Sequence, residues 1–118
     1  MTLQSPIVLV GFGSQAKAWA LNLRDSKQPI KIALRPNSAR KAQALAMGFE
    51  CIELEDHSLK NYSLFIMLIP DDTHHNFFEK NQSYLKEKSH FIYAHGFSLS
   101  KDLLHQKYPN FSHSLLAP

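Results

Sequence analysis

The sequence predicts an α/β protein with a doubly wound, mostly parallel sheet of six strands and helices on both faces. Apolar runs alternate along the chain with segments of helical periodicity, which is the pattern of repeated β-α units. The first apolar run, 7–10, leads directly into a turn with two glycines. The run 64–69 is continuously apolar and ends at Pro70, as a central parallel strand should. Together these features are typical of a Rossmann-type fold.

In the first half of the chain we expect three strands and two helices. The strands are placed at 7–10, 30–34 and 49–52, and the helices at about 14–26 and 38–47. Four apolar residues at helical spacing in the first helix should face the sheet, namely Ala16, Trp19, Ala20 and Leu23. Trp19 is therefore expected in the core. Gly48 should end the second helix, because glycine readily adopts the left-handed cap conformation.

The second half of the chain continues the alternation. Strands are expected at 64–69, 91–94 and 112–118, and helices at 55–60, from Thr73 to about Lys86, and near 101–106. Thr73 is a suitable helix cap, since its hydroxyl can accept a hydrogen bond from a free N–H group of the first turn. No linker, repeat or low-complexity segment interrupts this pattern.

Composition limits the classes of function. With 118 residues and 44% hydrophobic content, residues 1–118 should form one domain around one core. The net charge is +3 and the Lys and Arg residues are scattered except at 35–41, which argues against nucleic acid and favours small anionic partners. Cys51 is the one cysteine, so no internal disulfide forms, and we expect it to be buried. Without a leader or a long apolar run, the protein is expected in the cytoplasm with no membrane partner.

The turn after the first strand indicates a dinucleotide site. Gly11 permits a tight turn, Gly13 lets the backbone approach a pyrophosphate, and the small Ala16 allows the helix to pack closely on the strand. Free N–H groups and the helix dipole would then hold the anion. A plain strand-to-helix turn is the alternative interpretation.

A basic turn follows the second strand, where an NAD-binding fold usually has an acidic residue for the ribose hydroxyls. Arg35 stands there instead, and Ser38, Arg40 and Lys41 follow with no carboxylate nearby. Two guanidinium groups, an ammonium and a hydroxyl in this arrangement suit a 2′-phosphate. The alternative is that Ser38 only caps the helix and that Arg40 and Lys41 are solvated helix residues.

Three segments should meet at one crevice. The first, fourth and fifth strands are expected to end at one edge of the sheet, which would gather Gly11, residues 70–73 and His95. Carboxylates and imidazoles at 71, 72, 74 and 75 could suggest a metal site, but a polar loop before a helix explains them better. We therefore predict no metal site in this chain.

The order and spacing of five motifs resemble a known family. Residues 11–15, 20–26, 34–36, 68–71 and 94–97 are similar to segments of the N-terminal domain of ketol-acid reductoisomerase, also called acetohydroxy acid isomeroreductase. The resemblance covers about residues 7–118. It implies an NADPH-binding domain in branched-chain amino-acid biosynthesis. The enzyme rearranges 2-acetolactate or 2-aceto-2-hydroxybutyrate and then reduces it, using magnesium.

The resemblance also implies roles for individual residues. It implies that the residues following Gly11 line the pyrophosphate, namely Phe12, Gly13, Ser14 and Gln15. On the 2′-phosphate it places Arg35 and Ser38, with Arg40 at a position where a second serine is common. On the adenosine side it places Asp71, Asp72, Thr73 and His74. His95 matches the active-site histidine beside the nicotinamide and the substrate. Ala16 and Lys17 depart from the usual Gly and His.

In the family, a helical domain that follows this one supplies the magnesium ligands and most of the substrate pocket. The 118 residues contain no counterpart of that domain, so we expect the chain alone to be inactive, with magnesium and a 2-acetolactate-type substrate bound only in a complete enzyme. The alternative is a free-standing, non-catalytic NADP(H)-binding module. A more distant alternative is another NADP-dependent oxidoreductase. The sequence leaves open whether the chain forms a homo-oligomer.

Overall fold

The computed structural model describes residues 5–69, 73–93 and 108–115. Its centre is a six-stranded sheet in the order β3-β2-β1-β4-β5-β6, and every neighbouring pair is parallel. The strands are β1 (Ile7–Val10), β2 (Ile30–Leu34), β3 (Cys51–Glu53), β4 (Leu64–Met67), β5 (His90–Tyr93) and β6 (Ser112–Leu115). The strand order reverses at β1, as in doubly wound nucleotide-binding folds, so the predicted fold class is confirmed.

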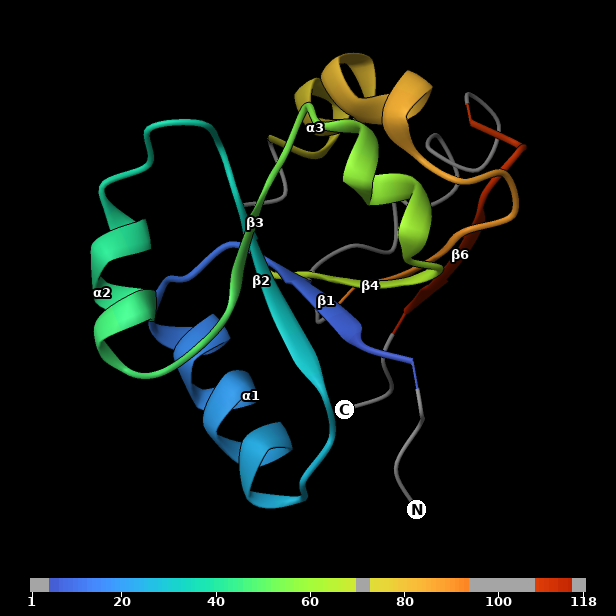
Figure 1. Cartoon of the computed structure of the whole chain (residues 1–118). Helices are drawn as coiled ribbons and strands as arrows, with labels where there is room; N and C mark the ends of the chain where they lie inside the picture. Colours follow the sequence, from blue (N-terminus) through green and yellow to red (C-terminus); the bar gives the residue numbers. More distant parts are fainter. Residues whose placement is uncertain (1–4, 70–72, 94–107, 116–118) are drawn as a thin grey trace.

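Helices cover both faces of this sheet. The described helices are α1 (Ser14–Asp25), α2 (Arg40–Ala46) and α3 (His74–Asn81), with shorter 3₁₀ turns η1 (His57–Asn61) and η3 (Gln82–Tyr84). Figure 1 shows α1 and α2 on one side of the sheet and α3 on the other. Alternate residues of β1 divide between the two faces: Ile7 and Leu9 pack toward α1 and α2, and Val8 and Val10 toward α3. None of the described helices is long and apolar enough to cross a membrane.

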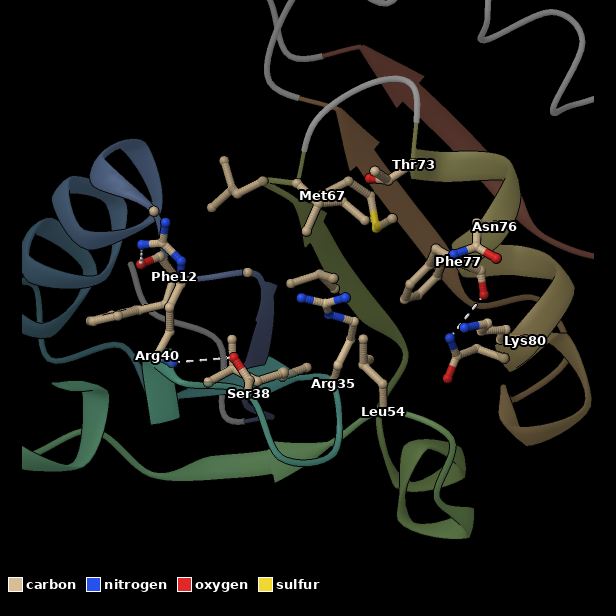
Figure 2. Close-up of a pocket in the computed structure, with 18 of the residues that line it drawn as sticks. Phe12, Arg35, Ser38, Arg40, Leu54, Met67, Thr73, Asn76, Phe77 and Lys80 are labelled. Atoms are coloured by element: carbon tan, nitrogen blue, oxygen red, sulfur yellow. Dashed lines mark hydrogen bonds between the residues drawn. The ribbon is translucent and has the colours of Figure 1, made fainter. Parts of the chain in front are cut away.

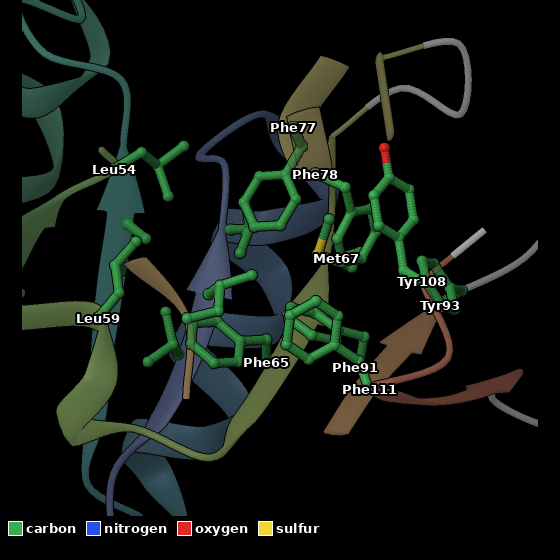
Figure 3. Close-up of a cluster of buried hydrophobic side chains, with 14 residues drawn as sticks. Leu54, Leu59, Phe65, Met67, Phe77, Phe78, Phe91, Tyr93, Tyr108 and Phe111 are labelled. Carbon is green, nitrogen blue, oxygen red and sulfur yellow. The ribbon is translucent and has the colours of Figure 1, made fainter. Parts of the chain in front are cut away.

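Aromatic rings fill the core beneath α3. Phe91 stacks on Phe65 with ring centroids 4.9 Å apart and meets the edge of Phe78 at the same distance. Phe78 in turn stacks on Tyr108 at 4.8 Å. Figure 3 shows these rings together between α3 and the strands β4 and β5. Such contacts add to the burial of large apolar surfaces and hold α3 against the half of the sheet formed by β4, β5 and β6.

Several element boundaries differ from those predicted. The third strand begins at Cys51 because Phe49 still takes part in the turn that ends α2, where its N–H donates to the carbonyl of Ala44 at 3.1 Å. The helix expected from residue 73 to 86 ends as α3 at Asn81. The Asn81 amide donates to the carbonyl of Phe77 (2.8 Å) and accepts from the N–H of Glu55 (2.6 Å), which anchors the helix end to the neighbouring loop.

Other predictions needed smaller corrections or lie outside the described residues. The helix expected at 55–60 is the 3₁₀ turn η1, and the fourth and fifth strands are 64–67 and 90–93. Cys51 is only partly buried, because β3 lies at the edge of the sheet. In α1, Ala16 and Ala20 are fully buried, whereas Trp19 and Leu23 pack at the margin of the core. The helix near 101–106 and the end of the last predicted strand, 116–118, lie outside the described residues.

Arg24 joins α1 to the end of α2, and its removal should destabilise the fold. Its guanidinium donates to the carbonyl of Met47 at 2.6 Å and lies 4.5 Å from the centre of the Phe49 ring. We expect Arg24→Ala to lower the free energy of unfolding by about 1 to 2 kcal/mol, measured by urea denaturation. Lys60→Ala, which removes an exposed charge from η1, is the control and should change it by less than about 0.5 kcal/mol. Equal stabilities of the two variants would contradict this role.

Candidate functional site

A cavity of about 950 Å³ lies at the carboxyl ends of β1, β2 and β4 (Figure 2). This is the edge at which doubly wound folds bind their ligands, and the volume is typical of a ligand pocket. The lining consists of residues 10–15, 33–35, 38–40, 54–55, 67–69, 73, 76–77 and 80–81. The predicted meeting of the glycine turn and Thr73 at one crevice is thus confirmed. Residues 70–72 and His95 lie outside the described residues.

Gly11 is required by the fold itself. Its φ is +105°, and a Cβ atom there would lie 3.0 Å from Cγ2 of Ile69 and 3.1 Å from the carbonyl oxygen of Leu68. The N–H of Gly11 donates to the carbonyl of Ala33 at 3.0 Å. The turn therefore passes directly over the ends of β2 and β4, where only glycine fits without strain.

Gly13 is different, because nothing in the described chain demands a glycine there. It precedes α1 with an ordinary extended conformation (φ −78°, ψ −170°), and a Cβ atom would have no described atom within 4 Å. No described side chain caps α1 and its first turn contains no acidic residue, so the first N–H groups form an electropositive end. Ser14 and Gln15, at this end, are exposed and line the cavity.

The basic turn after β2 forms a second wall. Arg35 is exposed and Ser38 partly exposed, and the N–H of Ser38 donates to the carbonyl of Arg35 at 3.1 Å. Asn37 between them has a φ of +65°, which a short polar residue tolerates. The hydroxyl oxygen of Ser38 accepts from the N–H of Arg40 at 3.2 Å, but the N-cap residue of α2 is Ala39, so Ser38 lies one residue before the cap position that the alternative interpretation gave it. Ser38 and Arg35 also line the cavity.

Phe12 and Arg40 both line the cavity, and the side chains of both also have partners within the chain. The Phe12 ring is 1% exposed and meets the edge of Phe49 at 5.8 Å between centroids, so only its backbone remains for a ligand. The Arg40 guanidinium, predicted at the 2′-phosphate, donates from Nη1 to the carbonyl oxygen of Phe12 at 3.0 Å. Figure 2 shows this bond between the basic turn and the glycine turn.

The wall formed by α3 contains residues that the sequence analysis missed. Asn76, Phe77 and Lys80 line the cavity together with Thr73. These residues recur at helical spacing from Thr73, so the face of α3 that looks onto the sheet edge could have been derived once the position of Thr73 was assumed. Figure 2 shows Asn76, Phe77 and Lys80 across the cavity from Arg35 and Ser38.

The described lining favours an anionic ligand. It carries three cationic side chains, Arg35, Arg40 and Lys80, against the single carboxylate of Glu55. The described groups with clearly shifted pKa values lie elsewhere: burial raises the pKa of Cys51, Tyr93 and Tyr108, and hydrogen bonds from Ser58 lower the pKa of Asp56. Among the described residues, no three metal-ligating side chains gather at one place. Because cationic side chains outnumber carboxylates in its described lining, the cavity is suited to binding an anion by electrostatic attraction.

A family model for the NADPH-binding domain of acetohydroxy acid isomeroreductase matches residues 2–118. The chain belongs to this family. The resemblance seen in the motifs is therefore confirmed over nearly the whole sequence, and NADP(H) is the cofactor of the domain.

Relatives with the same domain are ketol-acid reductoisomerases. The chain is 37% identical over 99 residues to the ketol-acid reductoisomerase (NAD(P)(+)) of Metallosphaera sedula, which covers 83% of the chain and 29% of that relative. It is 39% identical over 92 residues to the ketol-acid reductoisomerase (NADP(+)) of Helicobacter pylori, covering 77% of the chain and 28% of the relative. The chain therefore spans less than a third of the length of these enzymes.

Solved structures support the fold. A 3-hydroxyisobutyrate dehydrogenase from Mycobacterium tuberculosis superposes with a TM-score of 0.74 at 12% identity, over 94% of this chain and 39% of that one. A semialdehyde dehydrogenase NAD-binding protein from Cupriavidus necator gives a TM-score of 0.73 at 19% identity, over 94% and 40%. At these identities the likeness concerns the doubly wound architecture alone.

Proposed function

We propose that the cavity binds NADPH in preference to NADH, with the 2′-phosphate on the basic turn after β2. The observation that carries this proposal is the charge of the lining, in which Arg35 occupies the position of the acidic residue of NAD-binding folds. Arg35 is exposed, and its guanidinium has no acceptor among the described residues. It is therefore available to a phosphate, for which a guanidinium offers two parallel donors.

The geometry of the glycine turn is evidence for the proposed position of the pyrophosphate. Because the fold leaves open space where a side chain at Gly13 would be, the absence of a Cβ atom there is explained by the close approach of a ligand. The first N–H groups of α1 and the exposed Ser14 and Gln15 would then face the pyrophosphate. The backbone of Phe12 completes this subsite, while its ring stays in the core.

The remaining roles follow from the family relationship. We propose that Asp71, Asp72, Thr73 and His74 border the adenosine side and that His95 lies beside the nicotinamide and the substrate. In a complete enzyme the domain would serve the magnesium-dependent isomerisation and reduction of a 2-acetolactate-type substrate, in the cytoplasm, without nucleic acid or membrane as a partner. Thr73 is the one of these residues whose position at the cavity the structure describes.

A second candidate is a domain that accepts both cofactors. The Metallosphaera sedula relative is named for NAD(P)(+), so dual specificity occurs in a protein 37% identical to this chain. The two candidates differ in what Arg35 contributes to affinity, because only NADPH carries the 2′-phosphate.

Calorimetric titration of NADPH and NADH against Arg35→Ala tests the preference. Loss of charge-assisted hydrogen bonds to the 2′-phosphate should weaken NADPH binding by about 10- to 100-fold and leave NADH binding unchanged. The control is Lys60→Ala, which removes an exposed cation of η1 that does not line the cavity, and both affinities should stay near the wild-type values. Equal affinities of the wild-type chain for the two cofactors would instead support dual specificity.

A further inference from the structure

Arg40 connects two parts of the cavity that are far apart in the sequence. It is the first residue of α2, and its Nη1 donates to the carbonyl oxygen of Phe12, 28 residues earlier, at 3.0 Å. Phe12 lies between the two glycines of the turn after β1. The basic turn is thus tied to the glycine turn through one charge-assisted hydrogen bond, which Figure 2 shows.

This bond orients a peptide group of the glycine turn. The peptide bond between Phe12 and Gly13 is planar and trans, so its N–H points away from its carbonyl oxygen. Holding the oxygen against Arg40 therefore fixes the direction of the Gly13 N–H. The Phe12 ring is held separately by its edge contact with Phe49. The carbonyl of Gly13 accepts from the N–H of Lys17 at 2.9 Å in the first turn of α1, and the bond from Arg40 restrains the peptide group on the other side of Gly13.

Arg40 itself is less suited than Arg35 to bind the 2′-phosphate. One of its N–H groups is already committed to the Phe12 carbonyl, which directs the guanidinium toward the glycine turn. Arg35 has no such commitment among the described residues. The two arginines at this wall of the cavity therefore have different tasks.

We propose that Arg40 is a positioning residue that holds the glycine turn in the conformation that receives the pyrophosphate, and that it does not contact the 2′-phosphate. This inference rests on the proposed function, since it assigns Arg40 a role in the same cofactor site. It predicts that loss of Arg40 affects ligands with a pyrophosphate and spares ligands without one.

Three ligands separate this role from a direct phosphate contact. NADPH carries both groups, NADH lacks the 2′-phosphate, and adenosine 2′-monophosphate lacks the pyrophosphate. In Arg40→Ala we expect NADPH and NADH to bind about five- to tenfold more weakly, by one and the same factor, and adenosine 2′-monophosphate to bind as to the wild type. Arg35→Ala should weaken NADPH and adenosine 2′-monophosphate and spare NADH. Lys60→Ala again controls for the loss of one positive charge.

Three other binding patterns overturn the proposal. Weaker binding of NADPH and adenosine 2′-monophosphate with NADH unchanged would make Arg40 a direct phosphate ligand. Unchanged binding of all three would leave it without a role in the site, and weaker binding of all three with a lower melting temperature would make it a general structural residue. A wild-type chain that binds none of the three contradicts the proposed function instead. Hydrogen exchange then decides the inference: faster exchange of the Gly13 and Ser14 amides in Arg40→Ala supports it, and unchanged exchange overturns it.

Discussion

Replacement of Gly13 by aspartate is expected to abolish NADPH binding while leaving the fold at least as stable as before. A carboxylate at this position would stand where the pyrophosphate is proposed to lie. Two unit charges about 4 Å apart at a protein surface repel by about 4 kcal/mol before screening by salt. We therefore expect Gly13→Asp to weaken NADPH binding by about 100-fold or more, measured by calorimetric titration.

The same substitution should favour the folded state. Gly13 is the N-cap residue of α1, with an extended backbone that any residue adopts and open space around the position of a Cβ atom. Aspartate is a better N-cap than glycine and interacts favourably with the helix dipole, so the free energy of unfolding should rise by about 0.3 to 1 kcal/mol. A loss of NADPH binding in Gly13→Asp would then not result from unfolding.

Gly11→Ala provides the matched comparison. A Cβ atom there would meet Ile69 and the Leu68 carbonyl at about 3 Å, and φ of +105° is strained for alanine. We expect a loss of about 1 to 3 kcal/mol in the free energy of unfolding, read from urea denaturation. If Gly13→Asp binds NADPH like the wild type, the pyrophosphate does not lie at this turn. If Gly11→Ala is as stable as the wild type, the close packing of the turn is not important for the fold.

Features that depend on local pattern could be predicted from the sequence. The strands at 7–10 and 30–34 have the predicted bounds, because their apolar runs are enclosed by unambiguous turns. The glycine turn and the basic turn lie at one cavity because parallel strands place their carboxyl ends at the same edge. Both turns could be located from the sequence because each directly follows an apolar run.

Features that depend on distant contacts could not be predicted. The hydrogen bond from Arg40 to Phe12 joins residues 28 positions apart, and no local pattern distinguishes it from a phosphate contact. Likewise, the end of α3 at Asn81 depends on the backbone N–H of Glu55, which the fold brings near. The burial of the Phe12 ring depends on Phe49 across the α2 side of the core. In each case the outcome depends on a partner that is distant in the sequence.

The 118-residue chain, tested by itself, is expected to give no turnover of a 2-acetolactate-type substrate, even where it binds NADPH. Alkyl migration and carbonyl reduction require stabilisation of charge on the substrate oxygens, which a metal ion provides in the reaction implied by the family resemblance. No three metal-ligating side chains gather among the described residues, and the chain spans 28–29% of the Helicobacter pylori and Metallosphaera sedula enzymes. The family resemblance implies that the helical domain following this one supplies the residues that hold the metal.

The proposed role of His95 does not change this expectation. A positioned histidine that donates or accepts a proton typically contributes about 10² to 10⁴ in rate, which does not replace the charge stabilisation that a metal supplies. The assay follows NADPH oxidation by absorbance with 2-acetolactate and magnesium at high protein concentration, and His95→Ala serves to detect a contaminating enzyme. Turnover that persists in His95→Ala comes from a contaminant. Turnover that disappears in His95→Ala would show that these 118 residues form a complete active site. The expectation that another domain must supply the metal ligands would then be wrong.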